Sequence, residues 1–268
     1  MTTDDAPESR MTREVELLWG LDASPPRRGP KPRLSREVVI GAAIAIADAE
    51  GIEAVSMQRV AKELGYTTMS LYRHVDSKED LLVLMLDTAM DAPPPPPRSD
   101  GDWRAGLEEW CRGALELYRA RPWSVRVASS GPPVGPNGLR WMEAGLRELV
   151  GSGLPVGEAV QMLVLLSAVL RDTVRLEADM SRAARATGTT LVEIEHDYSV
   201  GLRRVVTAEE FPTIALMLEE QVLEQGSGAG PPDRVGGPAD ELEFGIRRIL
   251  DGIEAYVRAG EGTGGPSS

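Results

Sequence analysis

The segment from Leu64 to Val75 constrains the fold of this 268-residue chain more than any other stretch. Gly65 follows an apolar helical stretch, at a point where a left-handed residue ends one helix and redirects the chain. Thr67 can cap the helix that follows through its side-chain hydroxyl. Leu71 and Val75 are four residues apart, so they share one helical face and are expected to point into a core. The segment therefore predicts a helix, a turn and a second, short helix.

The opposite face of that short helix carries a different set of side chains. Met69 and Arg73 share this face, and Ser70 and Tyr72 flank it. Hydroxyl groups, an arginine and a tyrosine on the exposed side of a short helix suit the DNA major groove better than a protein core. We therefore predict a helix-turn-helix that binds DNA.

The distribution of charge along the chain is compatible with this prediction. The net charge of −13 by itself disfavours a nucleic-acid partner. Residues 27–78, however, hold nine Arg or Lys against six Asp or Glu, so this stretch carries +3 and the remainder carries −16. DNA responds to the local charge, because screening limits electrostatic interactions to about 8 Å at physiological salt. The acidic remainder should limit non-specific binding.

A basic, proline-rich segment precedes the first predicted helix. The segment 25–33 contains too much proline to be helical and is expected to form a flexible arm. Its residues Arg28, Lys31 and Arg33 are candidate DNA contacts, because the arm adjoins a predicted DNA-binding element. A solvated linker without a binding role is an alternative interpretation of equal weight.

Helix signals continue along the chain. Ser35, Ser56 and Ser77 are predicted N-caps of helices over residues 36–50, 57–64 and from 78 onward. After Pro93–Pro97, the apolar spacing predicts longer helices over 103–120, 139–150, about 156–187, 190–208, 208–225 and 240–259. No stretch alternates convincingly with a period of two residues, so the predicted fold is all-α.

These signals predict four regions. Residues 1–34 form a disordered or partly ordered extension, with the basic arm and one candidate amphipathic turn near Trp19. Residues 35–90 form a three-helix helix-turn-helix DNA-binding domain with a following fourth helix. Residues 98–260 form a larger helical domain for ligand binding and dimerisation, and residues 261–268 form a flexible tail.

The stretch from Ser35 to Met90 resembles the tetracycline-repressor (TetR) family of bacterial regulators. The resemblance is carried by Ala49-Glu50-Gly51-Ile52, by Ser56–Gly65 and by Leu71-Tyr72-Arg73-His74-Val75 followed by Lys78. The second domain is more loosely similar to the family's C-terminal domain, with the best match at Glu243–Glu254. The resemblance implies a repressor that binds a palindromic double-stranded DNA operator as a homodimer and is released by a small molecule. The N-terminus is acidic and polar, without a signal-peptide pattern, so we expect a cytoplasmic location.

The resemblance also implies which residues contact DNA. Base contacts are implied for Thr68, Met69, Tyr72 and Arg73, and for Gln58 of the preceding helix; phosphate contacts are implied for Ser56, Thr67, Ser70, His74 and Lys78. The chemistry agrees, since arginine can read guanine, glutamine can read adenine, and a methionine can press on a thymine methyl. Alternatively, Tyr72 serves mainly in packing and His74 is a structural histidine.

A twofold dimer needs an apolar, self-complementary surface, because operator half-sites lie about 34–36 Å apart. The last predicted helix and the C-terminal part of the long helix 156–187 are the candidates, and the last helix offers Ile246, Ile249, Ile253 and Val257. The alternative is that these residues close the core of the single chain.

A ligand pocket between helices should be mostly apolar with a few polar anchors. The candidate lining residues are Trp110, Trp123, Trp141, Met142, Met162, Arg171, Asp172 and Glu177. Alternatively, the tryptophans and methionines belong to the core and the charged residues form a salt bridge. No cofactor or metal is expected, because no cluster of histidines and carboxylates stands out.

Other functions are less well supported by the sequence. An enzyme would need a site built on His196, and nothing upstream resembles a nucleophile turn. Gly260–Gly265 matches the spacing of a dinucleotide-binding loop, but it follows a helix instead of a strand. The longest strongly apolar run, Met162–Leu170, is nine residues long and too short to span a membrane. A helical small-molecule-binding protein without operator binding remains the alternative.

Overall fold

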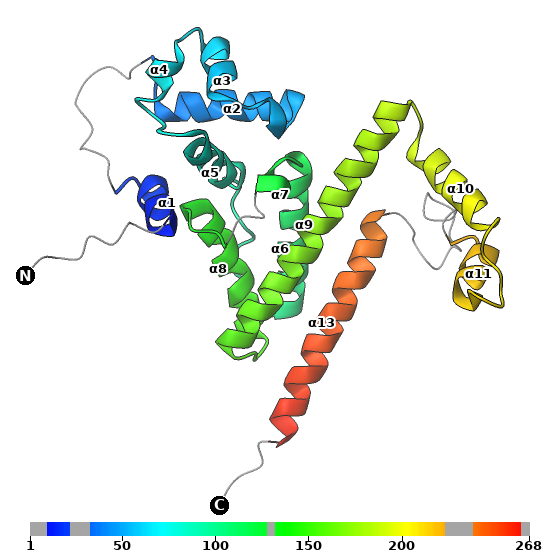
Figure 1. Ribbon diagram of the computed structural model, residues 1–268. Helices are drawn as coiled ribbons and strands as arrows, with labels where there is room; N and C mark the ends of the chain where they lie inside the picture. Colours follow the sequence, from blue (N-terminus) through cyan, green and yellow to red (C-terminus); the bar gives the residue numbers. More distant parts are fainter. Residues whose placement is uncertain (1–9, 22–32, 128–131, 223–237, 264–268) are drawn as a thin grey trace, which may run out of the picture. The chain divides into compact units, whose positions relative to one another are not determined.

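The computed structural model describes residues 10–21, 33–127, 132–222 and 238–263 (Figure 1). All regular secondary structure in these ranges is helical, which confirms the predicted all-α fold. The chain divides into two compact units, Met1–Arg171 and Asp172–Ser268, and the boundary falls inside the longest helix. None of the helices in these ranges has the combination of length and apolar character that a membrane span requires.

The predicted helix-turn-helix region is formed as expected. Its elements are α2 (Arg36–Glu50), the short 3-10 helix η1 (Ile52–Ala54), α3 (Met57–Leu64), α4 (Thr68–Leu71) and α5 (Lys78–Ala89). The hydroxyls of Ser35, Ser56 and Ser77 each accept a hydrogen bond from the backbone amide three residues on, at 3.4, 3.1 and 3.0 Å. Each serine thus satisfies an amide that the helix start leaves without a partner, and all three predicted caps are confirmed.

The predicted cap at Thr67 is wrong. Thr67 stands at the N-cap position of α4, but its side chain accepts no hydrogen bond from a backbone amide of that helix. The Thr67 hydroxyl instead lies 2.9 Å from the hydroxyl of Ser70, one turn further on. The two hydroxyls therefore hydrogen-bond each other. α4 is a single helical turn, and the chain continues through turns to Val75.

Further helices complete the first unit. They are α1 (Arg10–Trp19), α6 (Trp103–Ala120), α7 (Ser124–Val127), α8 (Pro136–Gly151) and the first part of α9 (Val156–Thr187). α8 begins three residues before the predicted start at Leu139, because Pro136 fits the first turn of a helix, where its missing N–H is not needed. α7 was not predicted, because four residues are too few to show a period.

The second unit contains the end of α9, α10 (Leu191–Leu202), α11 (Pro212–Glu219) and α13 (Pro238–Thr263). In α10, Thr190 and Glu193 satisfy each other's backbone amides in a capping box. α10 ends before the predicted residue 208, because the chain turns at Arg203. α11 also ends before the predicted residue 225, where Gln221 adopts a left-handed φ of 53°.

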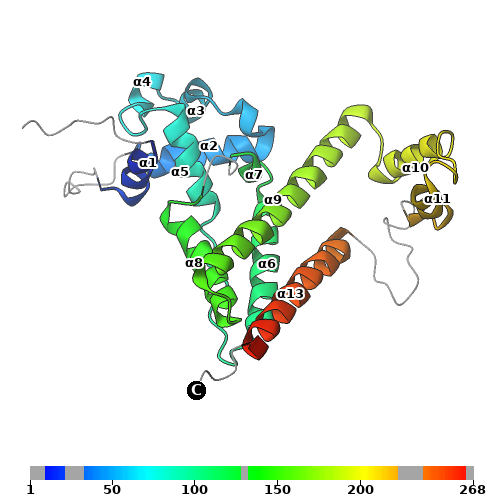
Figure 2. The same cartoon turned by 60° about the horizontal axis from the view of Figure 1, so that its bottom comes forward.

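Within the first unit, α6 and α8 pack closely against each other (Figures 1 and 2). Trp110 of α6 and Trp141 of α8 are buried, with ring centroids 6.4 Å apart, and the indole of Trp110 donates to the carbonyl of Trp141 at 2.8 Å. A Cβ on Gly145 would lie 2.5 Å from Cδ1 of Leu163 and 2.9 Å from Cε2 of Trp110. The absence of a side chain at Gly145 therefore allows this close approach.

The substitution Gly145→Ala should lower the free energy of unfolding by about 1–3 kcal/mol, because the added methyl overpacks the core. Denaturant unfolding followed by circular dichroism measures the change. Gly157→Ala on α9 is the control, since no atom lies within 4 Å of its Cβ position and alanine is the better helix former. Equal losses in the two variants would contradict the close packing at Gly145.

Candidate nucleic-acid interface

The predicted DNA-reading side chains lie on α4 and the turn that follows it. Leu71 and Val75 are 0% and 1% exposed, which confirms that they point into the core. Met69 and Tyr72 are 73% and 40% exposed, and Arg73 is exposed as well. Burial of one side of this short segment thus determines which side chains DNA can reach.

The other predicted contacts differ in exposure. Gln58, Thr67 and Arg33 are exposed, whereas Ser56, Thr68, Ser70, His74 and Lys78 are partly buried. Arg28 and Lys31 of the predicted basic arm lie outside the described residues. The structure therefore brings the predicted contacts of α3, α4 and the start of α5 into one helical unit, and Arg33 lies just ahead of α2.

The turn between α3 and α4 depends on Gly65. Its φ of 72° and ψ of 28° are left-handed, as predicted for the end of the first helix. The amide of Gly65 donates to the carbonyl of Lys62 at 3.2 Å, and that of Tyr66 donates to Ala61 at 2.9 Å. These bonds satisfy the last carbonyls of α3 and direct the chain into α4.

Arg59 is a basic residue of α3 that is engaged within the protein. Its guanidinium lies 2.5 Å from Glu63 and 2.7 Å from Glu50. The hydrogen bond with Glu63, followed by that with Glu50, raises the pKa of Arg59 above its ordinary value. The pairing of Arg59 with Glu50 was not predicted, because the turn between α2 and α3 is needed to bring the two residues together.

Asp87 connects the end of α5 to the start of α8. Its Oδ1 accepts hydrogen bonds from the amides of Asn137 at 3.1 Å and Gly138 at 3.0 Å, and the Asn137 side chain donates to the Asp87 carbonyl at 3.1 Å. Burial raises the pKa of Asp87, although the two backbone hydrogen bonds oppose that effect. The carboxylate of Asp87 in α5 therefore caps the N-terminus of α8, where the helix dipole favours negative charge. This contact was not predicted, because it joins residues 50 positions apart in the sequence.

The proline-rich linker that follows α5 is attached to α8 through its main chain. The indole of Trp141 donates to the carbonyl of Ala92 at 2.9 Å. Two turns further along α8, Arg147 donates to the carbonyl of Pro95 at 3.4 Å. Together with the Asp87 contact, these bonds join three successive points of the chain to one helix.

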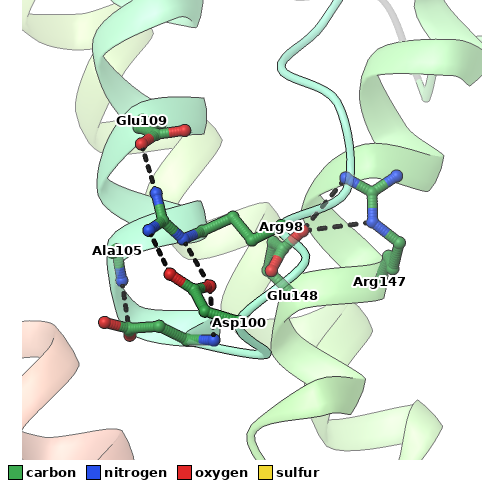
Figure 3. Close-up of polar contacts among 7 residues, drawn as sticks. Arg98, Asp100, Ala105, Glu109, Arg147 and Glu148 are labelled. Atoms are coloured by element: carbon green, nitrogen blue, oxygen red, sulfur yellow. Dashed lines mark hydrogen bonds and ion pairs between the residues drawn. The ribbon is translucent and has the colours of Figure 1, made fainter.

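A group of ion pairs holds the end of the linker (Figure 3). Arg98 lies 2.5 Å from Asp100 and 2.6 Å from Glu109 of α6. The hydrogen bond from Arg98 lowers the pKa of Asp100 to about 2. On α8, Arg147 lies 3.0 Å from the buried Glu148, so the guanidinium that contacts the linker has its own counter-charge.

The predicted ligand residues do not all lie together. Trp110 and Trp141 are buried side by side, and Met142 and Met162 are partly buried. Trp123 instead belongs to the core of the helix-turn-helix unit, where its indole donates to Asp48 of α2 at 2.6 Å.

The charged members of that predicted set have partners within the protein or lie in the second unit. Arg171 is partly buried and forms a side-chain hydrogen bond with the buried Tyr118 of α6. Asp172 is exposed and accepts from Arg175 at 3.0 Å, and Glu177 is partly buried. Within the described ranges, no group of three or more His, Cys, Asp or Glu residues is arranged to hold a metal ion.

The predicted dimer residues are mostly covered within the single chain. Ile246 and Ile253 are buried, and Ile249 and Val257 are partly buried. The same helix exposes Phe244 at 64%, beneath the guanidinium of Arg248, and Tyr256 at 59%. On α9, large exposed apolar side chains include Val164, Leu165 and Leu176. Phe244 and Tyr256 were not among the predicted dimer residues, whereas the C-terminal part of the long helix, which includes Leu176, was a predicted candidate.

Family comparisons agree with this arrangement. Residues 39–85 match the family model for bacterial regulatory proteins of the tetR family, and residues 95–257 match the model for the tetracyclin repressor-like C-terminal domain. The chain is 37% identical over 266 residues to the HTH-type transcriptional repressor DrrR1 of Streptomyces coeruleorubidus, an alignment covering 99% of this chain and 93% of that protein.

Two solved structures of ActR from Streptomyces coelicolor are also similar. The apo structure is 25% identical with a TM-score of 0.69, covering 86% of this chain and 100% of that chain. The structure of ActR in complex with actinorhodin is 26% identical, also with a TM-score of 0.69, covering 84% of this chain and 97% of that chain.

The substitution Asp87→Ala should lower the free energy of unfolding by about 0.5–2 kcal/mol, because it removes the cap of α8. Denaturant unfolding at neutral pH measures the loss. Asp91→Ala, which removes an exposed carboxylate four residues on, is the control and should have little effect. If both variants unfolded at the wild-type midpoint, the contact between α5 and α8 would contribute nothing to stability.

Proposed function

Because the chain belongs to the tetR family of bacterial regulatory proteins, we propose that it is a ligand-responsive repressor that binds a palindromic operator as a homodimer. The observation that supports DNA binding best is the exposed set of Met69, Tyr72 and Arg73 above the buried Leu71 and Val75. A short helix with this division of side chains can enter the major groove.

In this proposal α4 reads base edges and its surroundings contact phosphates. Arg73 donates to O6 and N7 of a guanine, and Gln58 of α3 pairs with an adenine. Met69 presses on a thymine methyl, as its 73% exposure permits. Partly exposed hydroxyls and Lys78 at the start of α5 contact phosphates, which position the protein without reading sequence.

The second operator half-site requires a second copy of the chain. Ile246 and Ile253 have little area left to bury in a dimer, because the single chain already covers them. We therefore place the dimer contact on the exposed apolar side chains of α13, with Phe244 and Tyr256 as its principal residues. Burial of these side chains against a second copy would remove exposed apolar surface from water, which favours association.

We place the ligand site beside Trp110 and Trp141, between α6 and α8. Trp141 hydrogen-bonds the linker at Ala92, and the start of α8 holds Asp87 of α5. A ligand that displaces Trp141 or α8 therefore moves α5, which changes the separation of the two recognition segments and releases DNA. An aromatic ligand such as the actinorhodin bound by ActR suits this site, because flat rings pack well against indoles.

The alternative is a helical small-molecule-binding protein without operator binding, and the net charge of −13 favours it. The local excess of basic residues around the helix-turn-helix argues for the regulator instead. We propose a cytoplasmic location, where the chromosome is, and no enzymatic activity.

Selection of bound DNA from a random pool tests the proposal directly. The purified protein should enrich an inverted repeat, because a symmetric dimer presents two identical recognition segments. Repeating the selection with actinorhodin tests the proposed ligand class, which should reduce the enrichment. Failure to enrich any sequence at low ionic strength would favour the alternative.

Arg73→Ala should weaken binding to the selected operator by about 1–3 kcal/mol and relax the preference at one guanine. Fluorescence anisotropy with labelled operator measures the affinity, and circular dichroism checks the fold. Arg112→Ala removes the same charge from an exposed position on α6 and should leave binding unchanged. Equal affinities of the two variants would exclude Arg73 as a base contact.

Phe244→Asp should shift the protein toward monomer, weakening dimerisation by about tenfold or more, because an aromatic side chain of the proposed contact is replaced by a charge. Sedimentation equilibrium measures the dissociation constant. Val192→Asp is the control: it also places a carboxylate at an exposed apolar position, but in the first turn of α10. A Phe244 variant that dimerises like wild type would place the dimer contact elsewhere.

A further inference from the structure

The N-terminal helix α1 packs on the helix-turn-helix unit, although it lies outside the segments 39–85 and 95–257 that match the family models. Leu17 and Leu18 pack against the core formed by α2–α5. The helix ends at Gly20, whose φ of 62° is left-handed, and the amide of Leu21 closes the turn on Glu16 at 3.0 Å. α1 is therefore an ordered part of the first unit.

One polar contact joins α1 to the start of α5. Nη2 of Arg13 lies 2.9 Å from Oδ2 of Asp80 and 3.9 Å from Oδ2 of Asp76. The Asp80 side chain is only 11% exposed, so salt screens this pair less than it would a pair on the open surface. The two aspartates flank Ser77, the cap of α5, and Lys78, our proposed phosphate contact.

A second contact reaches the end of the recognition segment through Arg36 of α2. Its Nη1 donates to the carbonyl of Leu17 in α1 at 3.4 Å. Its Nε donates to the carbonyl of His74 at 3.2 Å. One guanidinium thus connects α1 to the turn that follows α4, where Tyr72 and Arg73 lie.

A third contact joins α1 to the segment ahead of α8. The indole of Trp19 donates to the carbonyl of Val134 at 2.9 Å. Three residues further along the chain, the amide of Asn137 is held by Asp87 of α5. α1 therefore contacts both the DNA-binding helices and the segment through which α8 is attached to them.

We propose that α1 is a clamp for operator binding and that Arg13 and Trp19 are its positioning residues. This inference rests on the proposed function. α4 is a single turn and cannot order itself, so contacts that hold the chain after it lower the entropy lost when DNA binds. Arg13 acts through Asp80 and the start of α5, and Trp19 fixes the other end of α1. Release of the clamp weakens operator binding without removing a DNA contact.

Arg13→Ala, compared with Arg10→Ala, separates this role from a charge effect. Both variants lose one positive charge from α1, but Arg10 pairs with Glu14 within the helix and is 73% exposed. Arg13→Ala should weaken operator binding by up to about fivefold, the upper range for an ion pair with one exposed partner, and Arg13→Lys should restore part of it. Arg10→Ala should bind like wild type.

The salt dependence of binding distinguishes a clamp from a phosphate contact. A lost phosphate contact reduces the slope of log K against log salt by about one, whereas a positioning residue leaves the slope unchanged. A reduced slope for Arg13→Ala would overturn the clamp, because it would show that Arg13 itself touches DNA. Equal affinities of the Arg10 and Arg13 variants would also overturn it.

Hydrogen exchange on the DNA-free protein tests the clamp independently of operator binding. Arg13→Ala should speed exchange of the amides of His74 and Val75, and Trp19→Phe should speed that of Asn137, with α6 unchanged in both. Unchanged exchange at these amides would contradict the clamp even if the protein binds its operator. A wild-type protein that binds no DNA but shows the expected exchange would refute the proposed function, and α1 would then be a structural clamp only.

Discussion

A single turn of helix has almost no stability of its own in water, and α4 is a single turn. It persists because Leu71 and Val75 are buried beneath it, in the core shared by α2, α3 and α5. The exposed side chains of Met69, Tyr72 and Arg73 are therefore positioned by the apolar contacts of Leu71 and Val75. Operator recognition, in this view, depends first on the burial of two aliphatic residues and only then on hydrogen-bonding chemistry.

α8 is one of the elements through which the helices after the linker contact the DNA-binding helices, and Trp123 ahead of α7 is another point of contact. Its first amides bind Asp87, its Trp141 binds the carbonyl of Ala92, and its Arg147 binds that of Pro95. Trp141 also packs against Trp110, at the place where we locate the ligand. A displacement of α8 would consequently move Asp87, Ala92 and Pro95. These contacts are a physical basis for coupling the proposed ligand site to the DNA-binding helices.

Short-range signals made much of this structure predictable from sequence. The serine caps, the left-handed Gly65 and the apolar spacing act over three or four residues, and their predictions were confirmed. The pairing of Arg59 with Glu50 and the capping of α8 by Asp87 were missed, since each joins residues from different helices. Trp123 was expected near a ligand but hydrogen-bonds a residue 75 positions earlier, a separation that no local pattern can reveal.

The attachment of the linker has a consequence for how this segment can change during evolution. α8 holds Ala92 and Pro95 by their carbonyl oxygens, which every amino acid possesses. Replacing a side chain there would leave both acceptors in place, provided the extended backbone is kept. Inserting or deleting one residue would instead shift the acceptors out of register with Trp141 and Arg147. The linker should thus accept substitutions more readily than changes in its length.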